Sequence, residues 1–278
     1  MADQRLAEQH SRLTSRLLQE DRVITAFSGG ADSALLAVVA HQVLGRGALA
    51  VTAVSASLPA TERAAARDFA RAQGLPHAEV CTDELDRPQY VRNGADRCFH
   101  CKSALLDAIT PLATAMGAAV ALGTNLDDLS DYRPGQQAAA AAGAVFPLVD
   151  AGLTKADVRA LSRELRLPTA AKPAAACLSS RVAYGDPVTP GLLARIELAE
   201  DALHEAGFAR CRVRAHAQGS VARIEVPAED LEGVLRRREQ LAVLVAAAGF
   251  TFVTLDLAGL RSGSMNALLP LTVVRGTF

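Results

Sequence analysis

A short turn rich in small residues constrains the fold of this chain more than any other feature. Residues Ser28-Gly29-Gly30-Ala31-Asp32-Ser33 follow an apolar run at 23–27 and precede another at 34–40. This order predicts a strand, a tight turn and a helix whose first backbone N–H groups have no partner within the helix. Those N–H groups and the helix dipole stabilise an anion, and Gly29 and Gly30 allow close approach to the backbone. The turn therefore predicts a phosphate-binding site in an α/β fold.

The spacing of this turn excludes two common phosphate-binding loops. No lysine follows the glycines as in a Walker A loop, and the third glycine of a dinucleotide-binding fingerprint is absent. The pattern SGGxDS instead resembles the PP-loop of ATP pyrophosphatases, which split ATP into AMP and pyrophosphate to activate a carboxylate or carbonyl oxygen. In such a site Ser28 and Ser33 add hydroxyl donors, and Asp32 holds a cation or a ribose hydroxyl. A plain strand-to-helix turn is the alternative.

Composition narrows the class of protein. The 278 residues are half hydrophobic, which is enough for one large core or two smaller ones, and the formal net charge is −1. A nearly neutral chain argues against a nucleic-acid partner. The sequence contains no run of about 18 apolar residues, so we expect no membrane-spanning helix. The charged N-terminus has no signal-peptide pattern, so the five cysteines are read as reduced thiols of a cytoplasmic protein.

Strand and helix patterns alternate in the first part of the chain, which predicts βαβ units and a parallel sheet. We place a PP-loop (HUP-like) nucleotide-binding domain at 1–186 and a smaller α+β domain, for substrate binding or oligomerisation, at 187–278. The expected helices of the first domain cover 4–19, 33–44, 61–73, 102–116 and 155–166, and its strands 23–27, 49–54, 77–80 and 119–122. In the second domain we expect helices 190–206 and 229–248 and strands 210–216, 220–226 and 252–257.

Polar residues follow the expected strands at the edge where open α/β sheets bind ligands. Ser55 follows the second strand and is placed to meet an adenine ring through its backbone. Gly123-Thr124-Asn125 follows the last strand of the first domain. Next come Asp127, Asp128 and Asp131, of which Asp128 or Asp131 is a candidate ligand for the Mg²⁺ that neutralises a triphosphate. Capping of a helix is the alternative role for at least one of these carboxylates.

Cys177 is the candidate nucleophile, because Ser179, Ser180 and Arg181 surround it with polar and positive groups. Such a setting favours the thiolate form of a cysteine, although a free cysteine is often only a small core residue. Cys81 and Cys211 lie on expected strands, where a structural role is the simpler interpretation.

Arg212 and Arg214 alternate on an expected strand and so share one face, which suits bidentate binding of a phosphate or merely a solvated surface. Glu200, Glu225 and Asp230 are candidates for an acidic Mg²⁺ or Mn²⁺ site or solvated surface carboxylates.

Two longer motifs indicate a specific family. CLSSRxxYG at 177–185 and GTNxDDxxDYRPG at 123–135 resemble those of the LarE family of ATP-dependent sacrificial sulfur transferases, and the similarity covers nearly the whole chain. The resemblance implies adenylation of a carboxylate of pyridinium-3,5-biscarboxylic acid mononucleotide, in biosynthesis of the nickel-pincer cofactor of lactate racemase. It implies that Cys177 donates the sulfur and becomes dehydroalanine. It also implies ATP and Mg²⁺ as cofactors, Lys102 near the ATP phosphates, and Ser180, Arg181, Arg212 and Arg214 at the substrate phosphate.

Several alternatives stay open at this point. Some relatives are thought to use three cysteines for an iron–sulfur cluster, so Cys98, Cys101 and Cys177 are candidates for a [4Fe–4S] cluster that supplies the sulfur. Cys98 and Cys101 also fit a plain pair of reduced thiols. An ammonia-using PP-loop synthetase, a tRNA-thiolation enzyme and a nucleotide-binding regulator are the competing functions. The family resemblance further suggests a homo-oligomer that acts on a small nucleotide.

Overall fold

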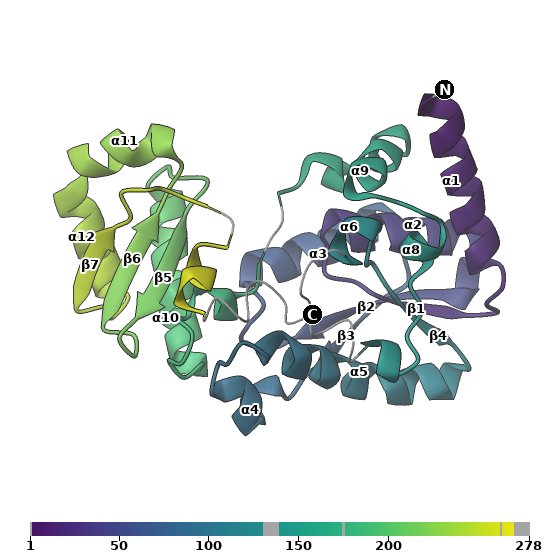
Figure 1. Cartoon of the computed structure of the whole chain (residues 1–278), viewed down its shortest axis with the longest axis horizontal. Helices are drawn as coiled ribbons and strands as arrows, with labels where there is room; N and C mark the ends of the chain where they lie inside the picture. Colours follow the sequence, from purple (N-terminus) through teal and green to yellow (C-terminus); the bar gives the residue numbers. More distant parts are fainter. Residues whose placement is uncertain (1, 130–138, 174–175, 262, 270–278) are drawn as a thin grey trace. The chain divides into compact units, whose positions relative to one another are not determined.

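The chain forms two compact units. In the computed structural model, residues 2–129, 139–173, 176–261 and 263–269 are described (Figure 1). The first unit comprises residues up to 83 together with 98–175, and the second comprises 84–97 together with residues from 176 onward. This division differs from the single boundary near residue 186 that the sequence suggested, because the chain enters the second unit twice. No helix in the described ranges is long and apolar enough to cross a membrane.

The first unit is built on a four-stranded sheet in the order β3-β2-β1-β4, in which every neighbouring pair is parallel. This confirms the predicted α/β class. Register pairs Val23 with both Ala48 and Ala119. The strands are β1 (Val23–Ala26), β2 (Ala48–Val54), β3 (His77–Cys81) and β4 (Ala119–Leu122). The helices are α1 (Ala2–Leu17), α2 (Ala31–Leu44), α3 (Ala60–Ala72), α5 (Arg97–Met116), α6 (Leu126–Leu129), α8 (Pro147–Asp150) and α9 (Lys155–Glu164), with 3-10 turns η1 (Gly45–Gly47) and η3 (Pro168–Ala171).

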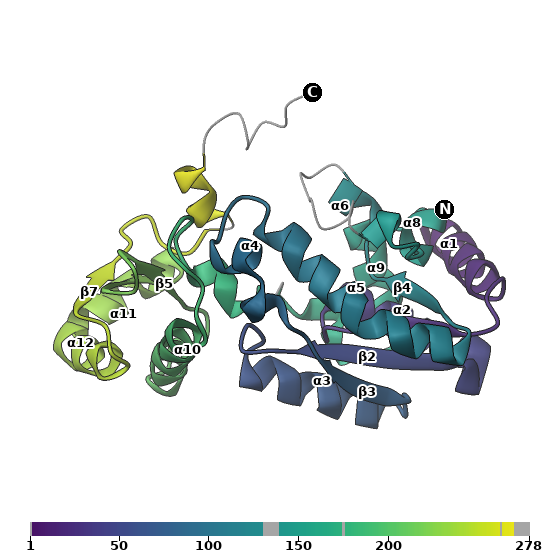
Figure 2. The ribbon, with the colours of Figure 1, turned by 90° about the horizontal axis from the view of Figure 1, so that it is seen from below.

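Helices cover both faces of this sheet, which explains why β1, β2 and β4 are mostly apolar. Ile24 and Val51 pack against Ile109 and Ala113 of α5 on one face. The opposite face packs against α2 and α3, so α3 and α5 lie on opposite sides of the sheet (Figure 2).

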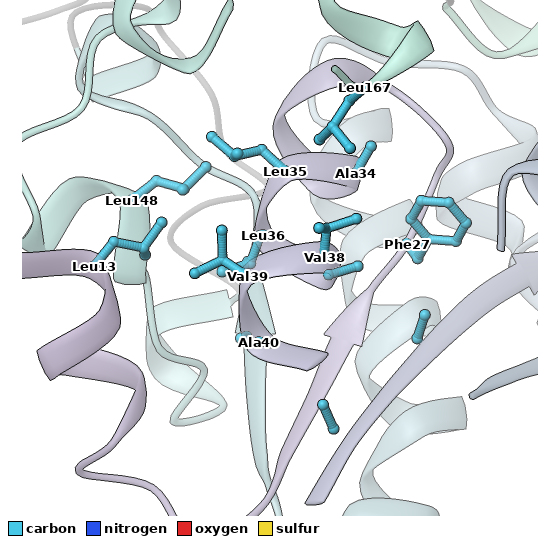
Figure 3. Packing of buried hydrophobic residues seen from close by; sticks show 14 of the residues in the cluster. Leu13, Phe27, Ala34, Leu35, Leu36, Val38, Val39, Ala40, Leu148 and Leu167 are labelled. Carbon is cyan, nitrogen blue, oxygen red and sulfur yellow. The ribbon is translucent and has the colours of Figure 1, made fainter. Parts of the chain in front are cut away.

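Helix α2 is the most deeply buried helix in this unit. Its residues 33–40 are all buried, because α2 lies between the sheet and other helices. Figure 3 shows its leucine and valine side chains near Leu13 of α1, Leu148 of α8 and Leu167. A helix that is apolar on all sides is stable only in such surroundings. The glycine turn at its N-terminus is therefore attached to a deeply buried helix.

The second unit contains a three-stranded sheet in the order β5-β6-β7. The predicted hairpin is confirmed: β5 and β6 are antiparallel, and β7 joins β6 in parallel. The strands are β5 (Arg212–His216), β6 (Val221–Glu225) and β7 (Phe252–Leu255). The helices are α4 (Pro88–Val91), α10 (Pro190–Glu205), α11 (Leu231–Arg236) and α12 (Arg238–Ala247), with 3-10 turns η2 (Glu84–Asp86), η4 (Leu178–Arg181), η5 (Ala228–Asp230) and η6 (Ser264–Leu268).

The single helix predicted for 229–248 is wrong, because the structure has two helices that meet at Arg237. This residue has φ −108° and ψ 17°. Its guanidinium donates to the carbonyl of Ala206 at 2.5 Å and lies 5.6 Å from the centre of the Phe208 ring. A tertiary contact thus interrupts a segment whose local pattern is helical throughout.

Residues 84–97 join the second unit through buried hydrogen bonds. Asn93, which is fully buried, donates from Nδ2 to the carbonyls of Ala183 at 2.8 Å and Asp186 at 2.9 Å. The hydroxyl groups of Tyr90 and Ser179 are 2.6 Å apart. The hydrophobic pattern of residues 84–97 does not indicate these hydrogen bonds, since they join side chains to residues about 90 positions later in the sequence. The sequence therefore assigned this segment to the first domain.

Candidate functional site

The first unit contains a pocket of about 430 Å³ at the carboxyl ends of its parallel strands. This volume lies within the range of small-molecule sites, and the position is the one expected for an open α/β sheet. The lining includes eight of the residues predicted to bind ATP, namely Ser28, Gly30, Asp32, Ser33, Lys102, Gly123, Thr124 and Asp128. The structure thus brings together residues from the glycine turn, α5 and the end of β4.

The glycine turn is held in one conformation by its own serines. Gly29 has φ +71°, and a side chain there would also lie 3.2 Å from Cβ of Ala66 in α3. The Ser33 hydroxyl donates to the Gly30 carbonyl at 3.1 Å and accepts from the Ser28 backbone N–H at 3.3 Å. These hydrogen bonds hold the turn in place at the N-terminus of α2, whose first residues line the pocket.

Carboxylates lie beside this anion site. Asp32 accepts a hydrogen bond from Nδ2 of Asn125 at 2.9 Å, and Asp128 accepts one from the Asn125 backbone N–H at 3.2 Å. Burial raises the pKa of Asp32, and the nearby charge of Asp128 raises it further. Two partly desolvated carboxylates next to a phosphate site fit Mg²⁺, which binds proteins through one or two carboxylates and the phosphates of a nucleotide.

The other predicted aspartates have different positions. Asp127 accepts a hydrogen bond from the backbone N–H of Lys155 at 2.7 Å, so its carboxylate stabilises the start of α9. Asp127 is also absent from the pocket lining. Asp131 lies outside the described residues.

Replacing Asp32 with asparagine is expected to raise the thermal stability of the ligand-free protein while weakening Mg²⁺–ATP binding at least about 10-fold. A raised carboxyl pKa means that ionisation destabilises the folded state. The penalty is present at neutral pH and disappears at acidic pH, where Asp32 is protonated in both folded and unfolded chains. Thermal unfolding should show a higher melting temperature than the wild type at pH 7, and this difference should vanish below the ordinary pKa of an aspartate. Asp127→Asn is the control, and equal Mg²⁺–ATP affinity in Asp32→Asn and the wild type would contradict the assignment.

Sequence reasoning missed several cationic residues of the pocket. Lys155 and Arg159 of α9 and Lys172, after η3, line it together with the predicted Lys102. Lys155 and Arg159 are four residues apart in a predicted helix, so the sequence already indicated that these two cations share one helix face. No motif marks Lys172.

The apolar side of the pocket also differs in detail from the prediction. Val51, Thr52 and Ala53 of β2 line it with Phe27 and Leu58, which forms a surface suited to a nucleotide base. Ser55 is absent from the lining, and its hydroxyl lies 2.8 Å from that of Ser57. Gly29 and Asn125 are also absent, and they support the turn and Asp32 instead.

In the second unit, Cys177 precedes η4 and is half-buried. Its carbonyl accepts hydrogen bonds from the backbone N–H of Ser180 at 3.0 Å, the Ser180 hydroxyl at 2.7 Å and the Arg181 guanidinium at 2.9 Å. Arg181 is itself fixed by Glu200, with nitrogen–oxygen distances of 3.0 and 3.1 Å. The backbone at Cys177 is therefore firmly held while the thiol remains partly accessible.

The predicted phosphate-binding arginines lie beside this cysteine segment. The backbone N–H of Ala183 donates to the carbonyl of Ala215 at 2.9 Å, which joins the segment to β5. Arg214 pairs with the buried Glu225 at 2.8 Å and donates to the Ser180 carbonyl at 3.3 Å.

Arg212 has no such partner among the described residues, since its guanidinium donates only to the adjacent Cys211 carbonyl at 2.8 Å. Burial and the charges of Arg181 and Arg214 lower its pKa. A phosphate at Arg212 would relieve that repulsion.

The three predicted acidic metal ligands do not converge with one another in the described part of the chain. Glu200 pairs with Arg181, and Glu225 accepts from Arg214, Arg223 and Ser264. Over the described residues, no three His, Cys, Asp or Glu side chains converge in a way that could hold a metal ion. The carboxylates of Glu200 and Glu225 therefore compensate buried arginines, and Asp230 ends the short turn η5.

The remaining cysteines fall into different environments. Cys98 is exposed and Cys101 is half-buried near the start of α5, where a spacing of three residues places them on one side of the helix. They belong to the first unit and Cys177 to the second. Cys211 is buried, and burial raises the pKa of its thiol to about 12, which makes it unreactive. Cys81 is exposed at the end of β3.

The sequence is similar to those of several known proteins over most of its length. No protein-family profile matches the sequence. An uncharacterized protein of Synechocystis sp. is 43% identical over 90% of this chain and 93% of its own length. Pyridinium-3,5-bisthiocarboxylic acid mononucleotide synthase of Lactiplantibacillus plantarum is 36% identical over 95% of this chain and 96% of its own length. An uncharacterized protein of Methanocaldococcus jannaschii is 25% identical over 87% of the chain.

Proposed function

Because the chain belongs to the LarE family, which includes the pyridinium-3,5-bisthiocarboxylic acid mononucleotide synthase of L. plantarum, we propose that it is an ATP-dependent sulfur transferase. Its substrate is pyridinium-3,5-biscarboxylic acid mononucleotide, and its product is a thiocarboxylate precursor of a nickel-pincer cofactor. The observation that carries this proposal is the composition of the pocket in the first unit. A glycine turn held by its own serines, two carboxylates and several cations surround one space there, as adenylation with ATP requires.

The first step is activation of a substrate carboxylate. Its oxygen attacks the α-phosphorus of ATP, pyrophosphate leaves, and an acyl-adenylate remains. The N-terminus of α2 and Lys102 stabilise the negative charge of the phosphates. Asp32 and Asp128 would hold Mg²⁺, which neutralises part of the triphosphate charge. Phe27 and Val51 offer apolar surface to the adenine ring.

The second step is sulfur transfer from Cys177. The thiolate attacks the activated carbonyl carbon and AMP leaves, so that a thioester joins protein and substrate. Removal of the Cα proton of Cys177 then breaks its Cβ–Sγ bond. Sulfur stays on the substrate as a thiocarboxylate, and residue 177 becomes dehydroalanine. Since each chain supplies one such sulfur, two chains are consumed for each bisthiocarboxylate.

Arg212 is expected to bind the phosphate of the mononucleotide, so Arg212→Ala should weaken substrate binding about 10- to 100-fold. Binding is measured by calorimetry with the mononucleotide and with the corresponding nucleoside, which lacks the phosphate. The variant should lose affinity only for the mononucleotide. The exposed Arg210→Ala is the matched control. An equal loss for both ligands would show that Arg212 supports the fold of the site rather than the phosphate.

The decisive experiment incubates the protein with ATP, Mg²⁺ and the biscarboxylic acid mononucleotide. Substrate-dependent release of pyrophosphate, together with a product in which sulfur replaces oxygen, is the expected result. Release of pyrophosphate only when ammonia is added, with an amide as product, would establish a synthetase instead. ATP binding without pyrophosphate release would indicate a regulator.

A further inference from the structure

Lys172 has no role in the reaction described so far, although it contacts the glycine turn directly. Its Nζ lies 3.1 Å from the carbonyl oxygen of Gly29 and 2.6 Å from Oε2 of Glu62 in α3. The side chain lines the nucleotide pocket and is 22% exposed. The ammonium group is therefore positioned where phosphates that bind the turn would lie.

The backbone around Lys172 is fixed by another residue of the pocket. Arg159 donates from Nη1 to the carbonyl of Ala170 and from Nη2 to the carbonyl of Lys172, both at 3.0 Å. The Lys172 backbone N–H also donates to the Thr169 carbonyl at 3.0 Å. Because the backbone is held on both sides, only the flexible side chain has to move in order to meet a ligand.

The ammonium group can exchange its contact with Glu62 for a contact with a phosphate. The two side chains of the pair keep 22% and 24% of their surface exposed, so water can hydrate Glu62 when the ammonium group turns toward a ligand. An ammonium group has three N–H donors, and the structure uses two of them on Gly29 and Glu62. A triphosphate carries several negative charges, so it competes effectively with the single charge of Glu62. Without nucleotide, Glu62 keeps Lys172 paired.

We propose that Lys172 is a further phosphate-binding residue of the adenylation site. When ATP binds, its ammonium group moves from Glu62 to the triphosphate, and it then stabilises the negative charge of the pyrophosphate that leaves. This rests on the proposed ATP-dependent function. It places Lys172 in the activation step, in which the bond between the α-phosphorus and the bridging oxygen breaks. Sulfur transfer, which involves only the acyl-adenylate and Cys177, does not need it.

The test compares Lys172→Met with Glu62→Gln, since both variants remove the same ion pair but only one removes the cation. Lys172→Met should slow pyrophosphate release about 100-fold, whereas Glu62→Gln should stay within about fivefold of the wild type. Lys172→Arg should restore part of the rate. Thermal unfolding of each variant excludes loss of the fold as the cause.

Equal losses in Lys172→Met and Glu62→Gln would overturn the proposal, because the ion pair itself would then be what matters. An unchanged rate in Lys172→Met would overturn it as well. If the wild type releases no pyrophosphate, the proposed function fails, and calorimetry with a nonhydrolysable ATP analogue then tests Lys172 separately. Weaker binding in Lys172→Met than in Glu62→Gln supports its phosphate role, and equal affinities, or no binding by the wild type, refute it.

Discussion

Cys177→Ala is expected to abolish thiocarboxylate formation while the protein still releases pyrophosphate from ATP in the presence of substrate. The thiol is the only part of Cys177 that the substitution removes, and the backbone there is held by Ser180 and Arg181. In the wild type, intact-mass spectrometry after turnover should show a loss of about 34 Da at residue 177, as β-elimination of a cysteine thioester requires. Cys81→Ser, which changes another accessible thiol, is the control and should behave like the wild type.

A different source of sulfur would give a different result. If the wild type keeps its mass over many turnovers and contains iron, the sulfur comes through a cluster rather than from the protein. In that case Cys98→Ser and Cys101→Ser should each lose both iron and activity, as Cys177→Ala would. Full thiocarboxylate formation by Cys177→Ala would refute both versions.

Gly123→Ala is expected to lower ATP affinity about 100-fold, because it displaces the backbone that binds the phosphates. A Cβ atom at residue 123 would lie 2.8 Å from the backbone nitrogen and 3.0 Å from Cα of Ser33. These are backbone atoms in the first turn of the deeply buried helix α2, so neither side can yield easily. We expect the free energy of unfolding to fall by about 1–3 kcal/mol as well. Calorimetry with ATP and urea unfolding measure the two effects.

Gly191→Ala is the matched control for this substitution. Gly191 is the second residue of α10, and a Cβ atom there would meet nothing within 4 Å. Alanine is favoured over glycine inside a helix by about 0.5–1 kcal/mol, so this variant should bind ATP normally and be no less stable than the wild type. Normal ATP affinity in Gly123→Ala would show that the end of β4 does not position the N-terminus of α2 for the phosphates.

The local sequence predicts the first unit well. Its strands and main helices lie close to their predicted positions, since apolar runs and helix signals coincide there. The Thr154 hydroxyl accepts from the backbone N–H of Asp157, and the Asp157 carboxylate accepts from that of Thr154, so α9 begins where a capping box is written in the sequence. Ser28 to Ser33 could be assigned to an anion site for the same reason. The start of a helix and the glycines before it are encoded by residues that are adjacent in the sequence, so they can be recognised without the tertiary structure.

Residues that meet across long distances in the sequence were not predictable in this way. Lys172 faces Gly29 and Glu62 only after the chain has completed the sheet and returned. In the sequence, Glu200 and Glu225 fit either metal ligands or solvated surface carboxylates, because a carboxylate alone does not reveal its partner. The structure supplies Arg181 and Arg214 as their partners. Helices α11 and α12 are separated at Arg237, whose guanidinium donates a hydrogen bond to the carbonyl of Ala206. No local sequence pattern indicates this hydrogen bond.

The order of strands and helices, the glycine turn and the family motifs around Cys177 were thus readable from the sequence alone, because each depends on neighbouring residues. The tertiary structure decided which charges neutralise one another and which stay available for a ligand. Arg181 and Arg214 are neutralised by buried glutamates, whereas Arg212 forms no ion pair in the described part of the chain. That distinction follows from the strong distance dependence of electrostatic interactions, and distances between remote residues exist only once the chain has folded.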